Sequence, residues 1–149
     1  MAFHFPLQAV LHLRQSMEHQ QELRLRAANQ QVARAQHMIE QMDLRRREFH
    51  SAQSRELSVG MRAAELRFGL QCEAELLLRR RRELEQQLVR MQQLRDQQRE
   101  VFHQARRARE TLESVRDRQL RGYEKDALRR EQRSLDDQFL LRREYLQRG

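Results

Sequence analysis

The apolar residues of this chain recur at alternating steps of four and three, and this spacing constrains the fold more than any other feature. After Pro6, the only proline, such a series runs from Leu7 to Phe49. Its later members are nearly all apolar, which is typical of the seam of a coiled coil. Proline suits the first turn of a helix because its missing N–H has no partner there. The sequence therefore predicts a first helix over about 5–50.

The series stops after Phe49, and a second one begins beyond a cluster of small residues. Ser51, Ser54, Ser58 and Gly60 gather in this break, so we expect a turn at about 51–60. The second series is Ala63, Leu66, Leu70, Leu77, Leu84, Met91, Leu94, Val101, Ala105, Ala108, Leu112 and Val115. It changes phase near Gly122 and continues through Leu128, Leu135, Phe139 and Leu146, which predicts a second helix over about 61–147.

The composition agrees with long helices and excludes a thick globular core. Of the 149 residues, 38% are hydrophobic and 35% charged, with four glycines and no tryptophan. Turn residues and alternating β-branched runs are too few for an all-β fold. We predict an all-α fold, a long antiparallel two-helix coiled coil (an α-hairpin), forming a single domain over residues 1–149.

The two predicted helices differ greatly in length. A short connection makes them antiparallel neighbours, so residues near 49 meet those near 63, and Leu7 meets the stretch around 105. About 40 residues of the second helix, from about 108 onward, then have no intramolecular partner. An exposed apolar stripe of that length is typical of a surface that binds another protein.

Motifs of catalysis, cofactor binding and metal binding are not found in the sequence. It contains no Gly-rich phosphate loop and no H-E-x-x-H, and its six histidines never fall four residues apart. Cys72 is alone and is expected beside the seam as a small, partly covered residue. We therefore predict a protein that is not an enzyme and that has no catalytic residue, no cofactor, no metal and no small-molecule substrate.

No apolar run approaches the roughly 20 residues of a transmembrane helix, and the N-terminal residues lack the pattern of a signal peptide. These features, with a single cysteine, favour a cytoplasmic protein.

The net charge of +8 raises the question of an anionic partner. Arginine clusters at 45–47, 79–82 and 106–109 could bind phosphates. However, acidic residues stand at helical spacing from many of these arginines, which favours a solvated surface of paired charges. Nucleic-acid binding is disfavoured because aromatic residues are scarce, and an acidic protein partner stays open as an alternative.

Two segments, FHFPLQAVLHLR at residues 3–14 and RREQRSLDD at residues 129–137, resemble those of a known family. It is the flagellar FliJ family, small two-helix proteins of the type III export apparatus. Residues 3–14, FHFPLQAVLHLR, follow the family's F-x-F-x-L start and its leucine-arginine heptad. Residues 129–137, RREQRSLDD, with Arg142-Arg143 after them, resemble its R-R-E-Q-K-x-L-D-E…R-R signature. Between these segments, Leu57-Ser58-Val59-Gly60 and the long helix after it match the family's layout, so the similarity covers essentially the whole chain.

The resemblance implies a component of flagellar protein export, similar to the central stalk of a rotary ATPase. The partners implied are the hexameric export ATPase, a membrane export gate protein and export chaperones. The residues expected to contact the ATPase ring are Phe3, Phe5, Leu7, Leu128, Arg129, Arg130, Arg133, Leu135, Phe139, Arg142 and Arg143. Those expected to contact the gate are Leu66, Phe68, Leu70 and Leu76.

The same resemblance implies a cytoplasmic protein held at the cytoplasmic face of the cell membrane, at the flagellar base, through its partners. Three alternatives stay open: a basic coiled coil that binds nucleic acid, the stalk of a related virulence-type secretion system, and a parallel homodimeric scaffold formed by opening the hairpin. The F-x-F-x-L start favours the flagellar stalk.

Overall fold

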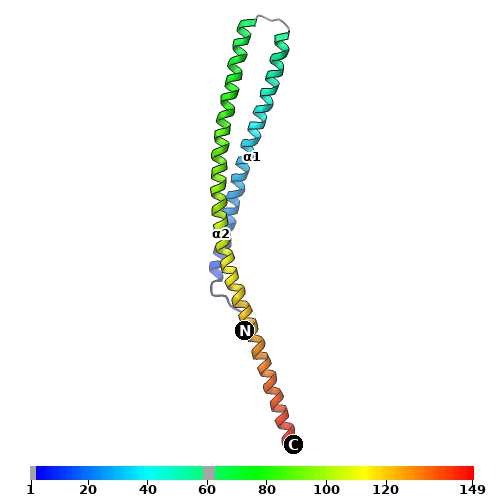
Figure 1. The fold of residues 1–149 in the computed structure, drawn as a ribbon. Coiled ribbons are helices and arrows are strands. Elements are labelled where there is room, and N and C mark those ends of the chain that lie inside the picture. Colours follow the sequence, from blue (N-terminus) through cyan, green and yellow to red (C-terminus); the bar gives the residue numbers. More distant parts are fainter. Residues whose placement is uncertain (1–2, 59–62) are drawn as a thin grey trace. The chain divides into compact units, whose positions relative to one another are not determined.

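The computed structural model describes residues 3–58 and 63–149, which form two long helices (Figure 1). Helix α1 is Gln8–Ser58 and helix α2 is Ala63–Arg148. The helices pack against each other, and no strand occurs within the two described ranges. The predicted fold class, an all-α hairpin with a much longer second helix, is confirmed.

The start of α1 follows from the proline. The carbonyl of Phe5 accepts a hydrogen bond from the N–H of Gln8 at 3.1 Å, and the carbonyl of Leu7 accepts one from Leu11 at 2.9 Å. A turn at Pro6-Leu7 therefore leads into the helix, which begins three residues later than predicted. Helix α2 begins two residues later than predicted and ends one residue later.

The predicted turn at 51–60 is corrected, because α1 continues through Ser58. The hydroxyl of Ser51 donates to the carbonyl of Glu48 at 2.8 Å, and that of Ser54 donates to His50 at 2.9 Å. A serine whose hydroxyl donates a hydrogen bond to a carbonyl of the preceding turn is compatible with a continuous helix. The rest of the predicted turn, residues 59 and 60, lies outside the described residues.

Helices α1 and α2 meet along one heptad seam. On α1 the covered positions recur at steps of three and four from Glu18 to Gln53, and on α2 they recur in the same way from Leu70 to Arg116. Lettering these seam positions a and d, each helix has flanking e and g positions on either side of the seam. The buried residues at a and d are Leu11, Val32, Ala35 and Leu84.

The predicted seam of α2 is correct at Leu70, Leu77, Leu84 and Met91 and again at Ala105 and Leu112, but it is wrong at Leu94 and Val101. The side chain of Leu94 is 59% exposed and that of Val101 is 43% exposed, and both stand at g. The seam positions in this part of α2 are Arg95, Gln98 and Phe102. Two of these three, Arg95 and Gln98, are polar and give no apolar signal, so the sequence pattern follows the neighbouring apolar residues Leu94 and Val101 instead. Leu66, also predicted on the seam, is exposed.

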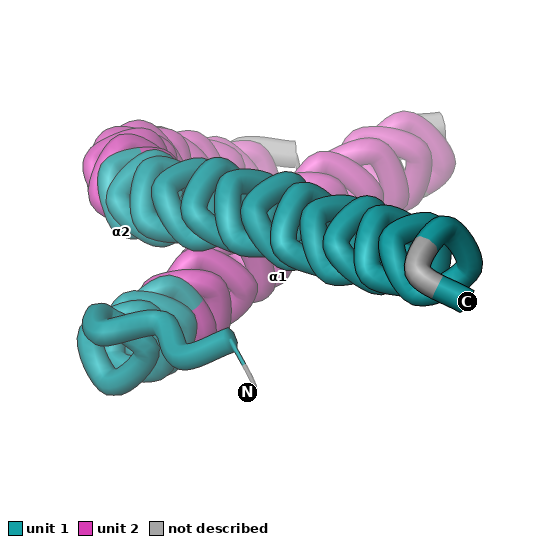
Figure 2. The backbone as a smooth tube through the Cα atoms, turned by 90° about the horizontal axis from the view of Figure 1, so that it is seen from below, with its two compact units in different colours: residues 1–18, 104–149 teal, residues 19–103 magenta. Residues whose placement is uncertain are grey.

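The chain divides into two compact units, coloured in Figure 2. Unit 2 is His19–His103 and contains most of α1 with the first half of α2. Its core is a single layer of side chains, in which only Val32, Ala35 and Leu84 are buried among the described residues.

Unit 1 consists of Met1–Glu18 and Gln104–Gly149. Its buried residues are Phe5 and Leu11, which are 4% and 0% exposed. The ring of Phe3 lies 5.8 Å from that of Tyr123, measured between centroids. The N-terminal segment of this unit therefore covers α2 as far as Tyr123.

The unpaired part of α2 is shorter than predicted. All described side chains from Glu124 to Gly149 are exposed, and we call this segment the overhang. The predicted turn placed Leu94 opposite Glu18, whereas Glu18 pairs with Arg109. When the turn moves by one residue along the chain, the residue of α2 that faces a given residue of α1 moves by two. The longer α1 therefore covers more of α2. Leu112 and Val115, predicted to be uncovered, are half-buried.

Candidate functional site

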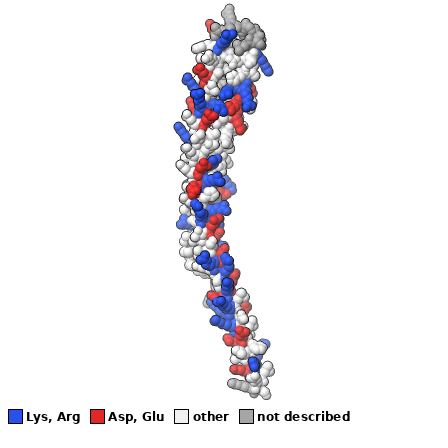
Figure 3. Space-filling view, viewed as in Figure 1, with Lys and Arg blue, Asp and Glu red and all other residues white. Residues whose placement is uncertain are grey.

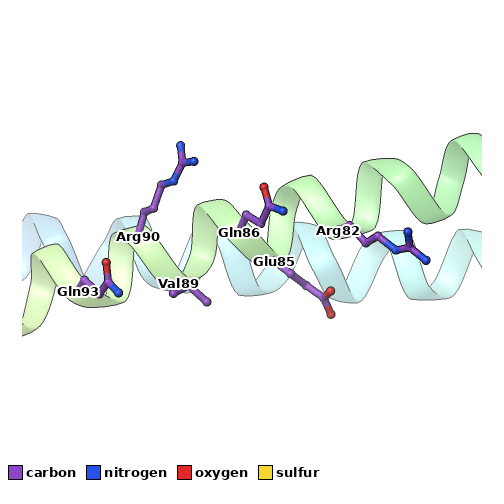
Figure 4. A pocket seen from close by; sticks show the side chains of 6 residues that line it. All are labelled: Arg82, Glu85, Gln86, Val89, Arg90 and Gln93. Carbon is purple, nitrogen blue, oxygen red and sulfur yellow. The ribbon is translucent and has the colours of Figure 1, made fainter.

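The main hollows in the described part of the chain are open to solvent. The hollow in Figure 4 is a shallow depression on the surface of α2, and the residues lining it come from that one helix. They are Arg82, Glu85, Gln86, Val89, Arg90 and Gln93. A surface of this kind lets water in from every side, so it offers none of the shielding that catalysis or small-molecule binding uses.

Within the described ranges, no three His, Cys, Asp or Glu side chains gather closely enough to hold a metal ion. Neither described helix contains an apolar stretch long enough to cross a bilayer.

Charged residues are interspersed over the surface, as the visible face in Figure 3 shows. Several arginines pair with acids one turn away: Arg81 with Glu85 at 2.6 Å and Arg106 with Glu110 at 2.9 Å. Glu83 pairs with Arg80, three residues before it, at 3.1 Å. These ion pairs neutralise part of the arginine clusters and agree with the expected surface of paired charges.

The overhang exposes a stripe of large apolar side chains. Leu128, Leu135 and Phe139, predicted to bind a partner, are each more than 60% exposed, and Leu146 continues their line. Steps of seven, four and seven place all four on one face of the helix. Leu140, Leu141 and Tyr145 are also exposed. The sequence pattern identified this stripe because its spacing is regular.

The predicted arginines surround that stripe unequally. At about 100° per residue, Arg142 falls on the stripe itself, while Arg129 and Arg143 lie along one flank. Arg130 and Arg133 lie on the other half of the helix, so they would meet a different part of any partner. Arg129 lies 3.6 Å from Asp126, and all five guanidinium groups are exposed.

The N-terminal predictions divide into three cases. Phe5 is buried, so it belongs to the core of unit 1, and its prediction as a partner contact is corrected. Phe3 is half-buried against Tyr123, at the point where the overhang begins. Leu7 is exposed. The apolar F-x-F-x-L pattern could not distinguish these cases, because it contains no information on which ring is covered.

The four residues predicted to contact the gate differ in exposure and in the face of α2 on which they lie. Phe68 and Leu76 are 71% and 64% exposed and lie, with the exposed Cys72, at steps of four on the outer face of α2. Leu70 is half-buried because it stands on the seam, and Leu66 is exposed beside it. The outward stripe that a partner could reach is therefore Phe68, Cys72 and Leu76.

Ion pairs link the helices across the seam in both units. In unit 1, Arg109 donates to both carboxylate oxygens of Glu18, and this hydrogen bond raises the pKa of the guanidinium. In unit 2, Arg81 donates to Asp43 at 2.7 Å and to Glu85 at 2.6 Å. The hydrogen bond from Arg81 lowers the pKa of the Asp43 carboxyl. Sequence periodicity missed these pairs because it weights only apolar residues.

Side-chain amide groups also link the helices. Gln98 donates to the side-chain oxygen of Gln21 at 2.7 Å, with both residues on the seam of unit 2. Gln15 donates to Glu113 at 3.5 Å in unit 1. These contacts satisfy polar groups where the seam lacks apolar residues.

Comparison of the chain with known proteins gives one clear result. Neither the curated proteins nor the solved structures contain a match to it. The family model described as flagellar FliJ protein matches residues 3–148, which is nearly the whole chain. The match agrees with the resemblance drawn from both ends of the sequence, and members of that family are non-enzymatic components of flagellar export. This chain belongs to the flagellar FliJ family and is a component of the flagellar export apparatus.

Proposed function

We propose that this protein acts as a stalk that inserts its overhang into the hexameric ring of the flagellar export ATPase. In this role it promotes assembly and activity of the ring and hydrolyses nothing itself. The other end of the hairpin contacts the membrane export gate, and the protein also binds export chaperones. It is cytoplasmic and reaches the cytoplasmic face of the membrane, at the flagellar base, only through these partners.

The observation that best supports the proposal is the exposed stripe of the overhang. A helix that leaves Leu128, Leu135, Phe139 and Leu146 in water has an apolar face that gains free energy when another protein covers it. A ring-shaped ATPase whose pore is lined by apolar and acidic residues would surround the overhang and cover this face. Arg129, Arg142 and Arg143 would then pair with acids of the pore lining.

The remaining predicted contacts have supporting roles. Arg130 and Arg133 lie on the other half of the overhang, where a ring that surrounds the helix would also reach them. Phe3 lies against Tyr123 at the base of the overhang, and Phe3 and the exposed Leu7 would contact the rim of the ring. Phe5 is excluded from the set because it is buried.

The contact with the export gate is proposed for the outward stripe near the start of α2. Phe68 and Leu76 are the largest apolar side chains of this face, with Cys72 between them. Leu66 would contribute at its edge. Leu70 would act indirectly, because its side chain supports α2 from the seam.

The test of ring insertion is ATP hydrolysis by the cognate export ATPase, titrated with the full-length protein. We expect stimulation that saturates near one chain per six ATPase subunits. The double variant Leu135→Asp, Phe139→Asp should raise the half-saturating concentration about tenfold or more, because two apolar anchors are lost. Its helical content should not change, since both side chains are exposed.

The matched control is Leu23→Asp, Leu44→Asp, which changes two exposed leucines on the outer face of α1. It should stimulate like the unmodified protein. Normal stimulation by the overhang variant would contradict insertion through this end.

The gate contact is tested separately by binding of the purified cytoplasmic domain of the gate protein. Phe68→Asp, Leu76→Asp should weaken this binding about tenfold or more and leave ATPase stimulation unchanged. Equal binding by this variant and by the Leu23, Leu44 control would contradict the assignment of the gate surface.

A further inference from the structure

The two sides of the seam in unit 2 differ in character. On one side, which we call the groove side, the g positions of both helices face each other, with c positions outside them. Met38, Leu94 and Val101 are exposed there. The side formed by the e and b positions has Val89 as its only exposed large apolar residue between 80 and 101 on α2.

Two hollows lie between the helices on the groove side. The first is lined by Leu94 and Val101 from α2 and by Ala27 and Ala28 from α1, with four polar residues around them. Those four are Arg24, Gln31, Gln97 and Gln98. The small alanines leave space beside the two large side chains, so the groove has an apolar floor.

The second hollow continues the same side nearer the start of α2. Its apolar lining is Met38, Met42 and Leu84, and Arg45 and Arg80 stand at its edges. Both hollows therefore belong to one face of unit 2, and each is lined by residues of both helices. Residues 80–101 of α2 extend over roughly 30 Å, the length of a helix of about 20 residues.

The width of the apolar stripe on α2 also points to another helix. A two-stranded coiled coil uses apolar residues at a and d only, whereas helices that pack against two neighbours have a third apolar position at e or g. Leu88 and Met91 occupy a and d, and Leu94 and Val101 add g. The packing of α1 against α2 involves only the a and d positions.

The charges of the groove side indicate what kind of helix fits. Between 24 and 45 on α1 and between 80 and 101 on α2, its g and c positions hold five basic residues and one acidic residue. The basic residues are Arg24, Arg34, Arg45, Arg80 and Arg90, and the acidic one is Glu83. Glu83 already pairs with Arg80 at 3.1 Å.

The other side has the opposite balance. Its e and b positions over 22–43 and 82–99 hold five acidic residues and three basic ones. The acids are Glu22, Glu40, Asp43, Glu85 and Asp96, and the bases are Arg26, Arg82 and Arg99. A basic, apolar face and an acidic, polar face therefore lie on either side of one seam.

From these observations we propose that the groove side of unit 2 binds an amphipathic helix of a partner protein whose apolar stripe is flanked by Asp and Glu. Its apolar residues pack between Leu94, Val101 and Met38, and its acids pair with the arginines at the edges. This site shares no residue with the overhang or with the Phe68 stripe, so it is independent of ring insertion.

The experiment measures binding of two synthetic helical peptides to the full-length protein by fluorescence anisotropy. Both have leucine at a and d over about 20 residues; one has glutamate at the flanking positions and the other has lysine. The glutamate peptide should bind about tenfold or more tightly than the lysine peptide. Leu94→Asp, Val101→Asp should weaken its binding about tenfold or more, because both anchors are removed.

The matched control, Leu44→Asp, Val89→Asp, changes two exposed residues outside the groove and should bind the glutamate peptide normally. In Arg24→Glu, Arg90→Glu the preference should reverse toward the lysine peptide. Absence of binding, equal affinity for the two peptides, or an effect of Leu44 and Val89 equal to that of Leu94 and Val101 would overturn the proposal. Self-association lost in the Leu94, Val101 variant would identify a second copy as the occupant and would also overturn it.

Discussion

Individual polar residues define the seam as firmly as apolar ones do. The side chains of Gln98 and Gln21 meet at 2.7 Å, and Arg81 and Asp43 meet at the same distance. A covered polar group loses hydrogen bonds to water, and a protein partner has to replace them. A shift of register would separate these partners and leave the groups unpaired. The pairs therefore favour one alignment of the helices over alternatives with similar apolar contact.

The exposed Leu94 and the buried Leu84 give a test of the seam. Leu84→Ala should lower the free energy of unfolding by about 2–5 kcal/mol, because it removes a buried side chain and leaves a cavity. Leu94→Ala should change it by less than about 0.5 kcal/mol, because Leu94 is mostly in water. Urea unfolding followed by circular dichroism measures both. Equal losses would mean that the seam passes through Leu94, as the sequence pattern suggested.

Asp43 makes stability depend on pH. Its carboxyl has a pKa below the ordinary value of 3.8 in the folded chain, owing first to the hydrogen bond from Arg81. The folded state then binds fewer protons than the unfolded state, so the contribution is complete above 3.8 and is lost as pH falls through the lowered pKa. Asp43→Asn should therefore destabilise the protein at about pH 6 and much less at about pH 3. Identical losses at both pH values, measured by urea unfolding, would exclude this linkage.

At the scale of the element, α2 shows that helix propensity can maintain a helix where no second helix packs against it. It has 86 residues, and its overhang is helical although every described side chain there is exposed. Arginine, leucine, glutamine and glutamate are good helix formers, and proline is absent from α2. The same composition that leaves little apolar surface for a core supports a helix that reaches past its partner.

Gly122 lies inside α2, and nothing within 4 Å would contact a Cβ added there. Glycine costs about 1 kcal/mol relative to alanine inside a helix. Gly122→Ala should therefore raise the free energy of unfolding by up to about 1 kcal/mol and raise the melting temperature. The control Gly149→Ala lies beyond the end of α2 and should change neither quantity. A loss of stability in Gly122→Ala would show that this position requires glycine for a contact.

At the scale of the whole molecule, the register of the hairpin decides which surfaces are free. Gln21 meets Gln98, whereas the turn predicted from the sequence would place Met91 opposite it. In a Cys72→Ser background, Gln21→Cys with Gln98→Cys should cross-link with a short bismaleimide. Gln21→Cys with Met91→Cys should not, because seven residues correspond to about 10 Å along the helix. The reverse result would restore the register predicted from the sequence.

The register also explains which candidate residues were predicted correctly. Leu128, Leu135 and Phe139 lie beyond the reach of α1 in either register, so their exposure followed from helix length alone. Leu112 and Val115 lie where the two registers differ, and they are half-buried. Phe5 was placed on the surface because an apolar N-terminal motif does not indicate its own contacts, and it is buried.

The sequence by itself determined the helical class, the number and order of the helices, the greater length of the second one and the membership of the FliJ family. The helical properties depend on local propensity and on the period of apolar residues, and the family membership rests on the motifs at both ends of the chain and on the family match. Only the tertiary structure decided where α1 ends, which residues of α2 lie on the seam, and where the overhang begins. Those properties depend on pairings such as Glu18 with Arg109 and Gln21 with Gln98, between residues far apart in sequence whose polarity gives no periodic signal.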